Sequence, residues 1–314
     1  MDGELLAFED AIALTEIGHE HLAELLHWAD CIRRHFFGCR ISFCCITPGR
    51  VGGCDQDCAW CAQSVANQSS VEPSSWRPDQ EWLMDLATRV EKSKAACFCV
   101  VSSGRRPRKG DLEVIETLNR NLLSAGLPRA CASLGELDVA DAERLRKAGV
   151  VRYNHNLETS RSHFGRVVGT HAYDDRMVTL RIARATGMDL CCGGIFGIGE
   201  AWSDRIELAL TLRDEIRPVV VPLNFLDACP GTPLAEFPAL APLECLHVVA
   251  LYRFLLPKTD IKIAGGRRML RDLRSWVFHA GATSLLVGDY LTTSGRPIED
   301  DLQMIHDLGL ELAT

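Results

Sequence analysis

The feature that most constrains the fold is a regular alternation that begins near residue 39. Short stretches rich in β-branched residues end in polar or glycine residues, and an amphipathic stretch follows each of them. Strands are predicted at 40–46, 97–102, 129–134, 150–157, 189–196, 218–225, 260–265 and 284–289. Helices are predicted at about 78–95, 112–125, 138–148, 171–186, 203–215, 242–256, 268–280 and 297–308. Eight such units predict an α/β fold with a parallel sheet closed into a (β/α)8 TIM-type barrel, and the alternative is an open, doubly wound sheet.

The chain before this alternation is predicted to form an N-terminal helical extension. Leu14, Ile17 and Leu22 contribute to an approximate helical stripe there. We therefore expect two parts, the extension at residues 1–38 and the barrel domain at residues 39–314, without a linker between them.

Charge and hydropathy exclude several classes of partner. The 314 residues carry a net charge of −8 and no basic block, so nucleic acid and an anionic membrane are not expected as partners. The most apolar run, Leu246 to Leu256, contains Arg253 and is too short to span a bilayer. Residues 1–9 are acidic, unlike a signal peptide. We expect a cytoplasmic protein, in which fourteen cysteines indicate metal binding or catalysis rather than disulfides.

Three of the cysteines, Cys54, Cys58 and Cys61, lie close together, with Trp60 just before the last. In a compact loop this spacing can direct three thiolates to one iron–sulfur cube and leave the fourth iron without a protein ligand. The alternative is a structural zinc site, but no histidine follows nearby, and an upstream cysteine such as Cys44 would have to fold back as the fourth ligand. The motif therefore favours a cluster with an open position.

Other unusual residues lie in or just after the predicted strands. In a barrel of this type the carboxyl ends of the strands face the active site. These residues are Cys97, Cys99, Cys131, Asn154, Asn156, Glu158, Cys191, Cys192, Asn224, Arg267, Thr292 and Thr293. Their positions predict that the functional site lies at the mouth of the barrel.

Strand periodicity assigns some of these side chains to faces, because successive side chains point to opposite sides of a strand. Asn154, Asn156 and Glu158 are predicted to project to one side, as a polar face whose hydrogen bonds a ligand would complete. Arg267 shares a face with Ile261, which would bring its guanidinium to the barrel mouth.

The remaining cysteines of the strands indicate a second site. Cys191 and Cys192 are adjacent, so only one of them can face inward. Taken singly, Cys99, Cys131 and Cys191 are expected to be buried hydrophobic residues. Together, on inner strands and with Arg267, they favour a second metal centre.

The Cys54, Cys58 and Cys61 motif resembles the signature of the radical S-adenosylmethionine (SAM) superfamily. Within that superfamily the chain resembles the biotin synthase family, from about residue 40 to the C-terminus. The motif alone is specific only to the superfamily, whereas further blocks in the same order indicate the family. These blocks are Tyr153 to Ser160, Cys191 to Glu200, Val221 to Asn224, Gly231 to Leu234, Ala264 to Arg267, and Leu291 to Thr293 with Glu299 and Asp300.

The resemblance implies insertion of sulfur by a radical mechanism. Three thiolates would hold a 4Fe-4S cluster, and SAM would bind the open iron through its amino and carboxylate groups. An electron from a flavodoxin-like or ferredoxin-like donor would cleave SAM to methionine and a 5′-deoxyadenosyl radical, which removes hydrogen from dethiobiotin. The carbon radical would take sulfur from an auxiliary iron–sulfur cluster, and a second SAM would complete the ring of biotin. Members of the family that resemble this chain are dimers, which implies a homodimer.

The resemblance also implies roles for individual residues. Cys99, Cys131, Cys191 and Arg267 match the ligands of the auxiliary cluster. A guanidinium is normally protonated, so the alternative for Arg267 is a salt bridge or hydrogen bonds to sulfide. The SAM-binding positions are matched by Asn156, Glu158 and Arg176, and the dethiobiotin-contact positions by Asn154, Asn224, Thr292 and Thr293.

Several residues depart from the common pattern of the family. Glu158 stands where many members have aspartate, Cys97 replaces a frequent arginine, and Cys44 lies ten residues before Cys54. The auxiliary centre is therefore either a 2Fe-2S cluster or a larger one that uses Cys44. Two other functions stay open: a radical SAM enzyme of the same subgroup, such as a hydrogenase maturase or methylornithine synthase, and a non-catalytic metal-binding protein.

Overall fold

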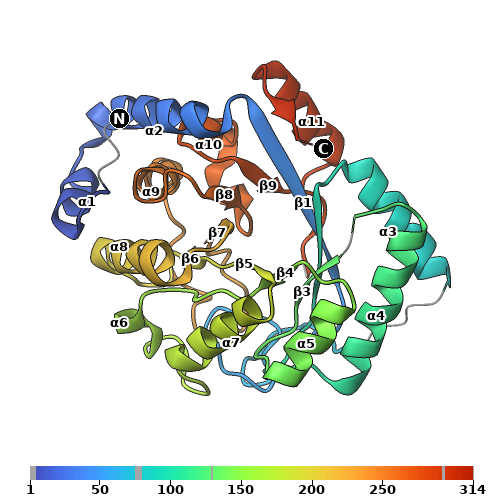
Figure 1. Cartoon of the computed structure of the whole chain (residues 1–314). Coiled ribbons are helices and arrows are strands. Elements are labelled where there is room, and N and C mark those ends of the chain that lie inside the picture. Colours follow the sequence, from blue (N-terminus) through green and yellow to red (C-terminus); the bar gives the residue numbers. More distant parts are fainter. Residues whose placement is uncertain (1–4, 75–79, 129, 292–293, 314) are drawn as a thin grey trace.

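The chain folds into a closed barrel of eight parallel strands surrounded by helices (Figure 1). The computed structural model describes residues 5–74, 80–128, 130–291 and 294–313. In barrel order the strands are β1 (Arg40–Pro48), β2 (Cys97–Val101), β3 (Ala130–Ser133), β4 (Arg152–Asn154), β5 (Asp189–Cys191), β7 (Val220–Phe225), β8 (Asp260–Ile263) and β9 (Ser284–Leu286). Parallel pairing of β9 with β1 closes the ring, with Ser284 opposite Ser42 and Leu285 opposite Phe43. The prediction of a TIM-type barrel is confirmed, and an open sheet is excluded.

The fifth predicted strand differs from the expectation, because it is divided into β5 and β6 (Gly194–Phe196). Both halves pair with β7. The break falls at Gly193, where a Cβ would lie 2.0 Å from the carbonyl oxygen of Pro222. Only glycine allows the backbone to approach β7 so closely at this point. A further strand, β10 (Glu311–Leu312), which was not predicted, pairs with the start of β1.

Helices follow the strands and cover the outside of the barrel. They are α3 (Gln80–Ser93), α4 (Lys109–Ser124), α5 (Val139–Lys147), α6 (Arg161–Phe164), α7 (Tyr173–Ala185), α8 (Trp202–Thr211), α9 (Pro242–Leu255), α10 (Trp276–His279) and α11 (Ile298–Asp307), with a π turn, η2 (Leu212–Ile216), after α8. The single helix predicted at 268–280 is wrong. It is a 3-10 segment, η3 (Arg267–Leu273), followed by α10, because Arg271 takes a positive φ of 47° that interrupts the helix.

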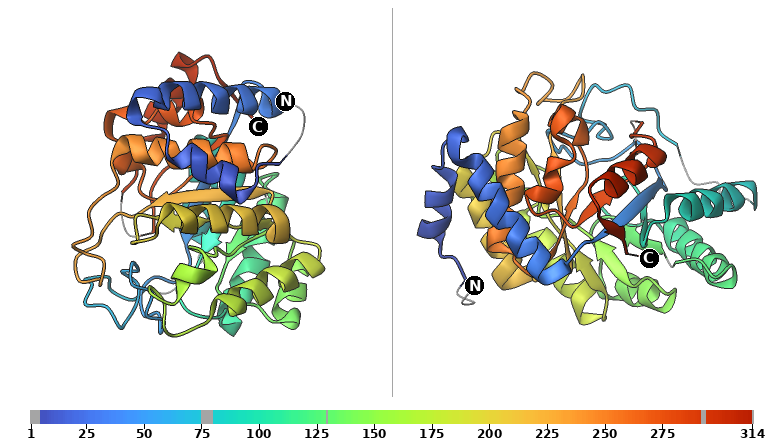
Figure 2. Two further views of the ribbon diagram at one scale, coloured as in Figure 1. Left: turned by 90° about the vertical axis from the view of Figure 1, so that its left-hand side faces the viewer. Right: turned by 90° about the horizontal axis from the view of Figure 1, so that it is seen from above.

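The N-terminal segment forms α1 (Phe8–Thr15), a short 3-10 turn η1 (His19–His21) and α2 (Leu22–Phe37). Figure 2 shows these blue helices on the outside of the barrel, and they contact α8 and α9. The ring Nε2 of His247 on α9 lies 2.8 Å from the carbonyl oxygen of Leu14, which fixes the end of α1 on the barrel. None of the described helices has the length and apolarity needed to cross a membrane.

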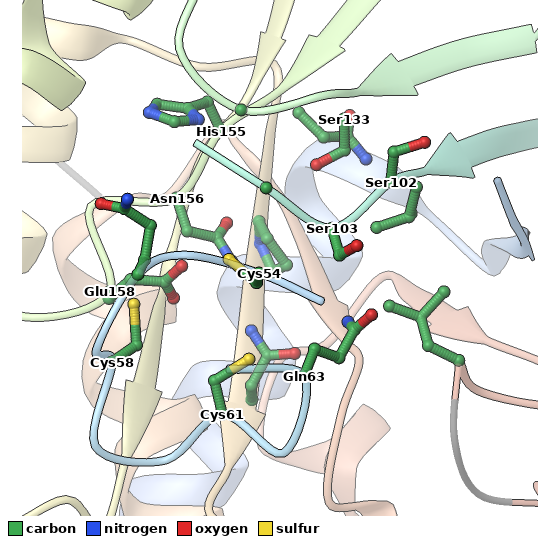
Figure 3. A pocket seen from close by; sticks show the side chains of 18 of the residues that line it. Cys54, Cys58, Cys61, Gln63, Ser102, Ser103, Ser133, His155, Asn156 and Glu158 are labelled. Atoms are coloured by element: carbon green, nitrogen blue, oxygen red, sulfur yellow. The ribbon is translucent and has the colours of Figure 1, made fainter. Parts of the chain in front are cut away.

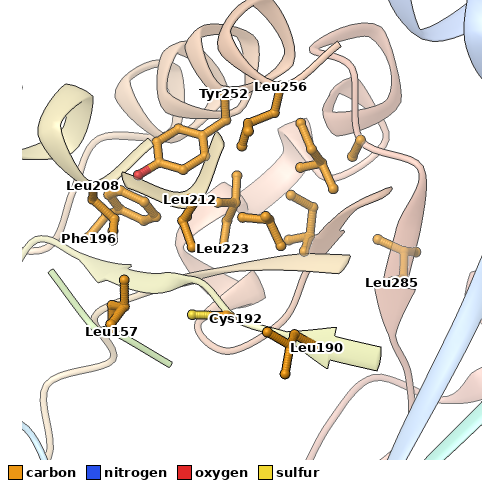
Figure 4. Close-up of a cluster of buried hydrophobic side chains, with 14 of the residues drawn as sticks. Leu157, Leu190, Cys192, Phe196, Leu208, Leu212, Leu223, Tyr252, Leu256 and Leu285 are labelled. Atoms are coloured by element: carbon orange, nitrogen blue, oxygen red, sulfur yellow. The ribbon is translucent and has the colours of Figure 1, made fainter. Parts of the chain in front are cut away.

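The main hydrophobic core lies between the strands and the helices. Figure 4 shows part of it, where Cys192, Phe196 and Leu223 from the barrel wall lie near Leu208 and Tyr252 from the helices. A separate, small apolar cluster contains Cys44, Ala264 and Leu286. Cys44 is on β1, Leu286 is on β9 and Ala264 follows β8, so this cluster lies where β9 pairs with β1.

Candidate active site

A cavity of about 360 Å³ opens among the carboxyl ends of the strands. Its wall includes all three cysteines of the sequence motif, Cys54, Cys58 and Cys61, and Figure 3 shows Cys58 next to Glu158 and Cys61 next to Gln63. The structure thus places the motif after the first strand and at the barrel mouth, as the sequence predicts.

Backbone hydrogen bonds give the cysteine loop its shape. The amide of Cys54 donates to the carbonyl of Gln63 at 3.0 Å, and the amide of Cys61 donates to the carbonyl of Cys58 at 3.0 Å. The side-chain amide of Asn67 donates to the carbonyls of both Cys58 and Cys61, at 3.1 and 2.8 Å. These bonds use backbone groups of the loop and the side chain of Asn67, and they leave the three thiols free to face the cavity.

The thiols of this loop need a cation to ionise. Burial raises the pKa of Cys58 to about 12 and also raises the pKa of Cys61. Thiolates are the form that binds iron, and a metal centre supplies the positive charge that stabilises them. Three partly buried thiols on one cavity wall therefore fit a 4Fe-4S cluster that takes three protein ligands.

The polar residues after β4 line the neighbouring wall. Asn154, Asn156 and Glu158 all border the cavity, and so does His155, because β4 ends at Asn154 and strand alternation does not extend to the residues after it. The Asn156 side-chain oxygen accepts a hydrogen bond from the amide of Gly193 at 3.1 Å, which ties this wall to the break between β5 and β6. Arg176, from α7, donates to the carbonyl of Asn156 at 2.8 Å and lies 3.4 Å from a carboxylate oxygen of Glu158.

Three buried polar atoms on this wall have no hydrogen-bond partner among the described residues. They are Oδ1 of Asn154, Nε2 of His155 and Oε2 of Glu158. Burial raises the pKa of Glu158 and lowers the pKa of His155 well below its usual value. Glu158 also has a positive φ of 70°, which is strained for a non-glycine residue. Buried groups of this kind normally have partners, so the wall is arranged to receive a polar ligand.

Deeper in the barrel lies a second group of cysteines. The sulfurs of Cys97 and Cys131 are 3.1 Å apart, and the side-chain amide of Asn154 donates to the sulfur of Cys99 at 3.2 Å. Cys191 borders the same cavity as the first cysteine loop. Its neighbour Cys192 is in the hydrophobic core instead, so only one of this adjacent pair faces inward, as predicted.

A buried lysine accompanies these cysteines. Nζ of Lys262, on β8, lies 3.5 Å from the sulfur of Cys191 and 3.6 Å from the sulfur of Cys44. Burial alone would lower the pKa of Lys262, but the surrounding cysteines, with Cys191 and Cys44 first, raise it well above its usual value. The raised pKa of Lys262 thus depends on negative charge on the surrounding sulfurs. Arg152, on β4, has its pKa raised by the same thiols despite the opposing effect of burial.

Comparisons with known proteins identify the family. Residues 50–212 match the Radical SAM superfamily, and residues 222–311 match the Biotin and Thiamin Synthesis associated domain. A biotin synthase of Trichlorobacter lovleyi is 46% identical over 100% of this chain and 94% of its own length. A biotin synthase of Geobacter metallireducens is 41% identical over 98% of this chain and 94% of its own.

The chain belongs to the biotin synthase family. Membership of the Radical SAM superfamily implies SAM and a 4Fe-4S cluster as cofactors, which agrees with the three thiols of the cysteine loop. Among solved structures, methylornithine synthase superimposes with a TM-score of 0.85 at 20% identity, covering 100% of this chain and 96% of that one. The [FeFe]-hydrogenase maturase HydG gives 0.82 at 17% identity, covering 99% of this chain and 72% of that one. At such identities these two structures support the barrel fold alone.

The structure does not bring Arg267 to the cysteines, contrary to the expectation for a biotin synthase family member. Its guanidinium pairs with both carboxylate oxygens of Asp301, at 2.8 and 2.6 Å, and with the carbonyl of Leu286 at 2.8 Å. The sequence analysis had placed Arg267 on the same strand face as Ile261 and had assumed that this face points into the barrel. Ile261 and Ile263 pack in the core outside the barrel, so the residue between them, Lys262, faces inward.

Three further residues were predicted to contact the substrate. Asn224 borders the cavity, but its side chain is engaged, since it accepts from the amide of Gly265 at 2.8 Å and donates to the carbonyl of Gly194 at 3.0 Å. Thr292 and Thr293 lie outside the described residues. The sequence analysis did not identify Lys262 as a site residue, and only the structure shows that it faces the cysteines.

Proposed function

We propose that this chain converts dethiobiotin to biotin by radical insertion of sulfur. The observation that carries the proposal is a single cavity bordered by both groups of cysteines. Cys54, Cys58 and Cys61 lie on one part of its wall, and Cys191 with Lys262 lies on another. A substrate in this cavity would be in reach of a radical generator and of a sulfur source at the same time, which is the arrangement that a sulfur insertion needs.

In this proposal Cys54, Cys58 and Cys61 hold the 4Fe-4S cluster, and SAM binds next to it. When bound, the cluster and SAM together supply the 5′-deoxyadenosyl radical. Glu158 would accept hydrogen bonds from SAM through its unpartnered Oε2. Arg176 and Asn156 border the same wall and would complete the site. A guanidinium there is suited to a carboxylate group such as that of SAM.

The auxiliary cluster is proposed to lie deeper in the barrel. Its cysteines would be Cys99, Cys131 and Cys191. Lys262 would take the position next to the cluster that the family resemblance had assigned to Arg267. A lysine ammonium is a donor and a positive charge rather than a metal ligand, so we assign it to balance the thiolates and to donate to sulfur. The nearby sulfurs of Cys97 and Cys44 leave two versions, a 2Fe-2S cluster or a larger one that uses these additional thiols.

Dethiobiotin is proposed to lie between the two centres. Asn154 has an unpartnered side-chain oxygen at the cavity and would accept a hydrogen bond from the ureido ring. Asn224 shapes the wall through its two backbone contacts. Thr292 and Thr293 stay proposals that rest on the family pattern. Closure of the site would keep water and reductants from the radical.

Other parts of the proposal concern the protein as a whole. We propose the division into a helical extension at 1–38 and a barrel domain at 39–314, a homodimer, and a cytoplasmic location. The electron donor would be a flavodoxin-like or ferredoxin-like protein. That donor would supply the electron that cleaves SAM, whereas the dimer and the location do not enter the chemistry of the site.

The test is rescue of a biotin auxotroph that is blocked in the last step, together with an assay of the purified protein. The protein is loaded with iron and sulfide under anaerobic conditions and given SAM, a reductant and dethiobiotin. We expect growth without biotin, and biotin and 5′-deoxyadenosine in the assay. Formation of 5′-deoxyadenosine without biotin would favour another substrate. Zinc in place of iron, or no 5′-deoxyadenosine, would contradict the radical mechanism itself.

A further inference from the structure

The segment between Cys54 and Cys58 is hydrogen-bonded to the loop that precedes α7. One carboxylate oxygen of Asp57 accepts hydrogen bonds from the backbone amides of Gly169 and Thr170, both at 3.0 Å, and from the hydroxyl of Thr170 at 2.8 Å. A Cβ at Gly169 would lie 2.7 Å from the other oxygen of Asp57, so a larger residue would disturb this contact.

A second contact joins the same two segments and continues to the SAM-binding wall. Nδ1 of His171 lies 2.8 Å from the side-chain oxygen of Gln56. On the other side of the ring, Nε of Arg176 donates to Nε2 of His171 at 3.2 Å. The side chain of Gln56 therefore connects to Arg176 through a single imidazole ring.

The donors and acceptors of this connection are determined by its two ends. A guanidinium only donates, so Nε2 of His171 must accept and Nδ1 must carry the proton. The side-chain nitrogen of Gln56 donates to Asp55 at 3.0 Å, which turns its oxygen toward His171. The ring must therefore be neutral. This agrees with the pKa of His171, which burial and then Arg176 lower to about 4.

The position of Arg176 depends on these bonds. Besides His171, it contacts the carbonyl of Asn156 at 2.8 Å and the carboxylate of Glu158 at 3.4 Å. The ring of Phe164 contacts the edge of the His171 ring, with centroids 5.6 Å apart at 71°, and holds the imidazole in place. Polar contacts thus connect Gln56 in the cysteine loop to Glu158 by way of His171 and Arg176.

We propose that Gln56 and His171 are positioning residues that set Arg176 and Glu158 relative to the iron–sulfur loop. The inference rests on the proposed SAM site. SAM has to meet the open iron and the residues of α7 and β4 at once, so its affinity depends on the spacing of the two walls. The cysteine loop, when loaded, orders the SAM-binding residues through this path, and bound SAM in turn steadies the loop.

The experiment measures equilibrium binding of SAM to the anaerobically loaded protein, without dethiobiotin and without reductant. His171→Phe keeps the ring contact with Phe164 but removes both hydrogen bonds. We expect it to keep wild-type iron and sulfide content and to bind SAM about tenfold more weakly, the size expected for losing hydrogen bonds that involve a charged group. His171→Gln can donate and accept at once, and we expect affinity within about threefold of wild type. Gln56→Leu tests the path from its other end and should match His171→Phe.

The matched control is His306→Phe, because the side chain of His306 is 84% exposed on α11 and far along the chain from the site. Equal SAM affinity of wild type and of both His171→Phe and Gln56→Leu would overturn the inference. Loss of the cluster in both variants would also overturn it, because the residues would then only hold the loop. Biotin is not measured here, so a protein that binds SAM but makes no biotin would contradict the proposed function and leave this inference standing.

Discussion

Nζ of Lys262 lies 3.5 Å from the sulfur of Cys191, in the interior of the barrel and at the wall of the cavity. The lysine is 6% exposed, so water does not replace its contacts with sulfur. An ammonium group in such surroundings is stabilised by thiolates, and thiolates are stabilised by it. The position of Lys262 therefore indicates a site that is suited to several thiolates close together.

The first prediction follows from that charge. Lys262→Met keeps the length of the side chain and removes the ammonium, so the thiolates of the auxiliary site lose a partner worth about 4 kcal/mol per charge pair at this kind of distance. We expect the variant to keep the iron of the Cys54 loop and SAM cleavage, but to lose auxiliary iron and at least tenfold of its biotin yield. Iron and sulfide analysis, with separate assays of 5′-deoxyadenosine and biotin, measures this.

Lys262→Arg restores a positive charge and should recover most of the auxiliary iron. Lys258→Met, at an exposed position beyond the end of α9, is the matched control and should behave as wild type. Wild-type auxiliary iron in Lys262→Met would show that the ammonium does not belong to the site.

The second prediction separates Arg267 from the auxiliary site. Its partner Asp301 is fully buried, and Arg296 is a second cation 3.1 Å from the same carboxylate. Removing one member of a buried ion pair costs about 3–5 kcal/mol, and the second arginine places Arg267→Met near the lower end of that range. We expect a lower free energy of unfolding in urea with unchanged iron per folded chain.

Arg268→Met is the neighbouring control, because Arg268 is 67% exposed and pairs with Asp227 at the surface. It should change the free energy of unfolding by less than about 1 kcal/mol. If Arg267→Met kept its stability and lost auxiliary iron, Arg267 would belong to the cluster site after all.

The contrast between Lys262 and Arg267 shows what the sequence could not supply. In a parallel barrel both faces of a strand are buried, so apolar residues occur on the inner and the outer face alike. Ile261 and Ile263 therefore did not reveal whether they faced helices or the interior. The partners of Lys262 come from β1 and β5, far away in the sequence. By contrast, the spacing of Cys54, Cys58 and Cys61 is local, and it was sufficient to place the loop.

The fold was predictable for a similar reason. Each β-α unit is a local pattern, and eight of them leave a closed barrel as the favoured arrangement. One miss arises from a tertiary contact and the other from a local backbone conformation. Gly193 breaks the fifth strand because the backbone of Pro222 is too close for a Cβ. Arg271 breaks the predicted helix at 268–280 although Leu270 and Val277 follow a helical period. Neither feature can be recognised in a single sequence.

The third prediction concerns Cys131. Its sulfur is 3.1 Å from that of Cys97 and it is buried within the second group of cysteines, away from the Cys54 loop. We expect Cys131→Ala to bind and cleave SAM like wild type and to lose biotin formation by at least about 100-fold, because a missing ligand removes the auxiliary cluster. Cys39→Ala, at an exposed thiol, is the control. An unchanged biotin yield in Cys131→Ala would contradict the assignment of the auxiliary site.

The last prediction concerns pH and the N-terminal helices. His247 is buried against the carbonyl of Leu14, and burial lowers its pKa despite the opposing effect of that hydrogen bond. A histidine with a lowered pKa in the folded state binds fewer protons than the unfolded chain. Its contribution to stability is therefore complete above the ordinary histidine pKa of about 6.5 and is lost as the pH falls from there toward the lowered value. Docking of α1 should weaken over that interval.

Hydrogen exchange of the α1 amides measures this effect directly. We expect their protection to fall as the pH decreases from about 7.5 to about 5.5, after correction for the intrinsic exchange rates. His247→Gln keeps a donor toward Leu14 but cannot titrate, so its α1 protection should be nearly independent of pH in this interval. His306→Gln, at the exposed position on α11, should retain the wild-type dependence. If His247→Gln shows the same pH dependence as wild type, the prediction is wrong. Protonation of a group other than His247 would then weaken the docking of α1.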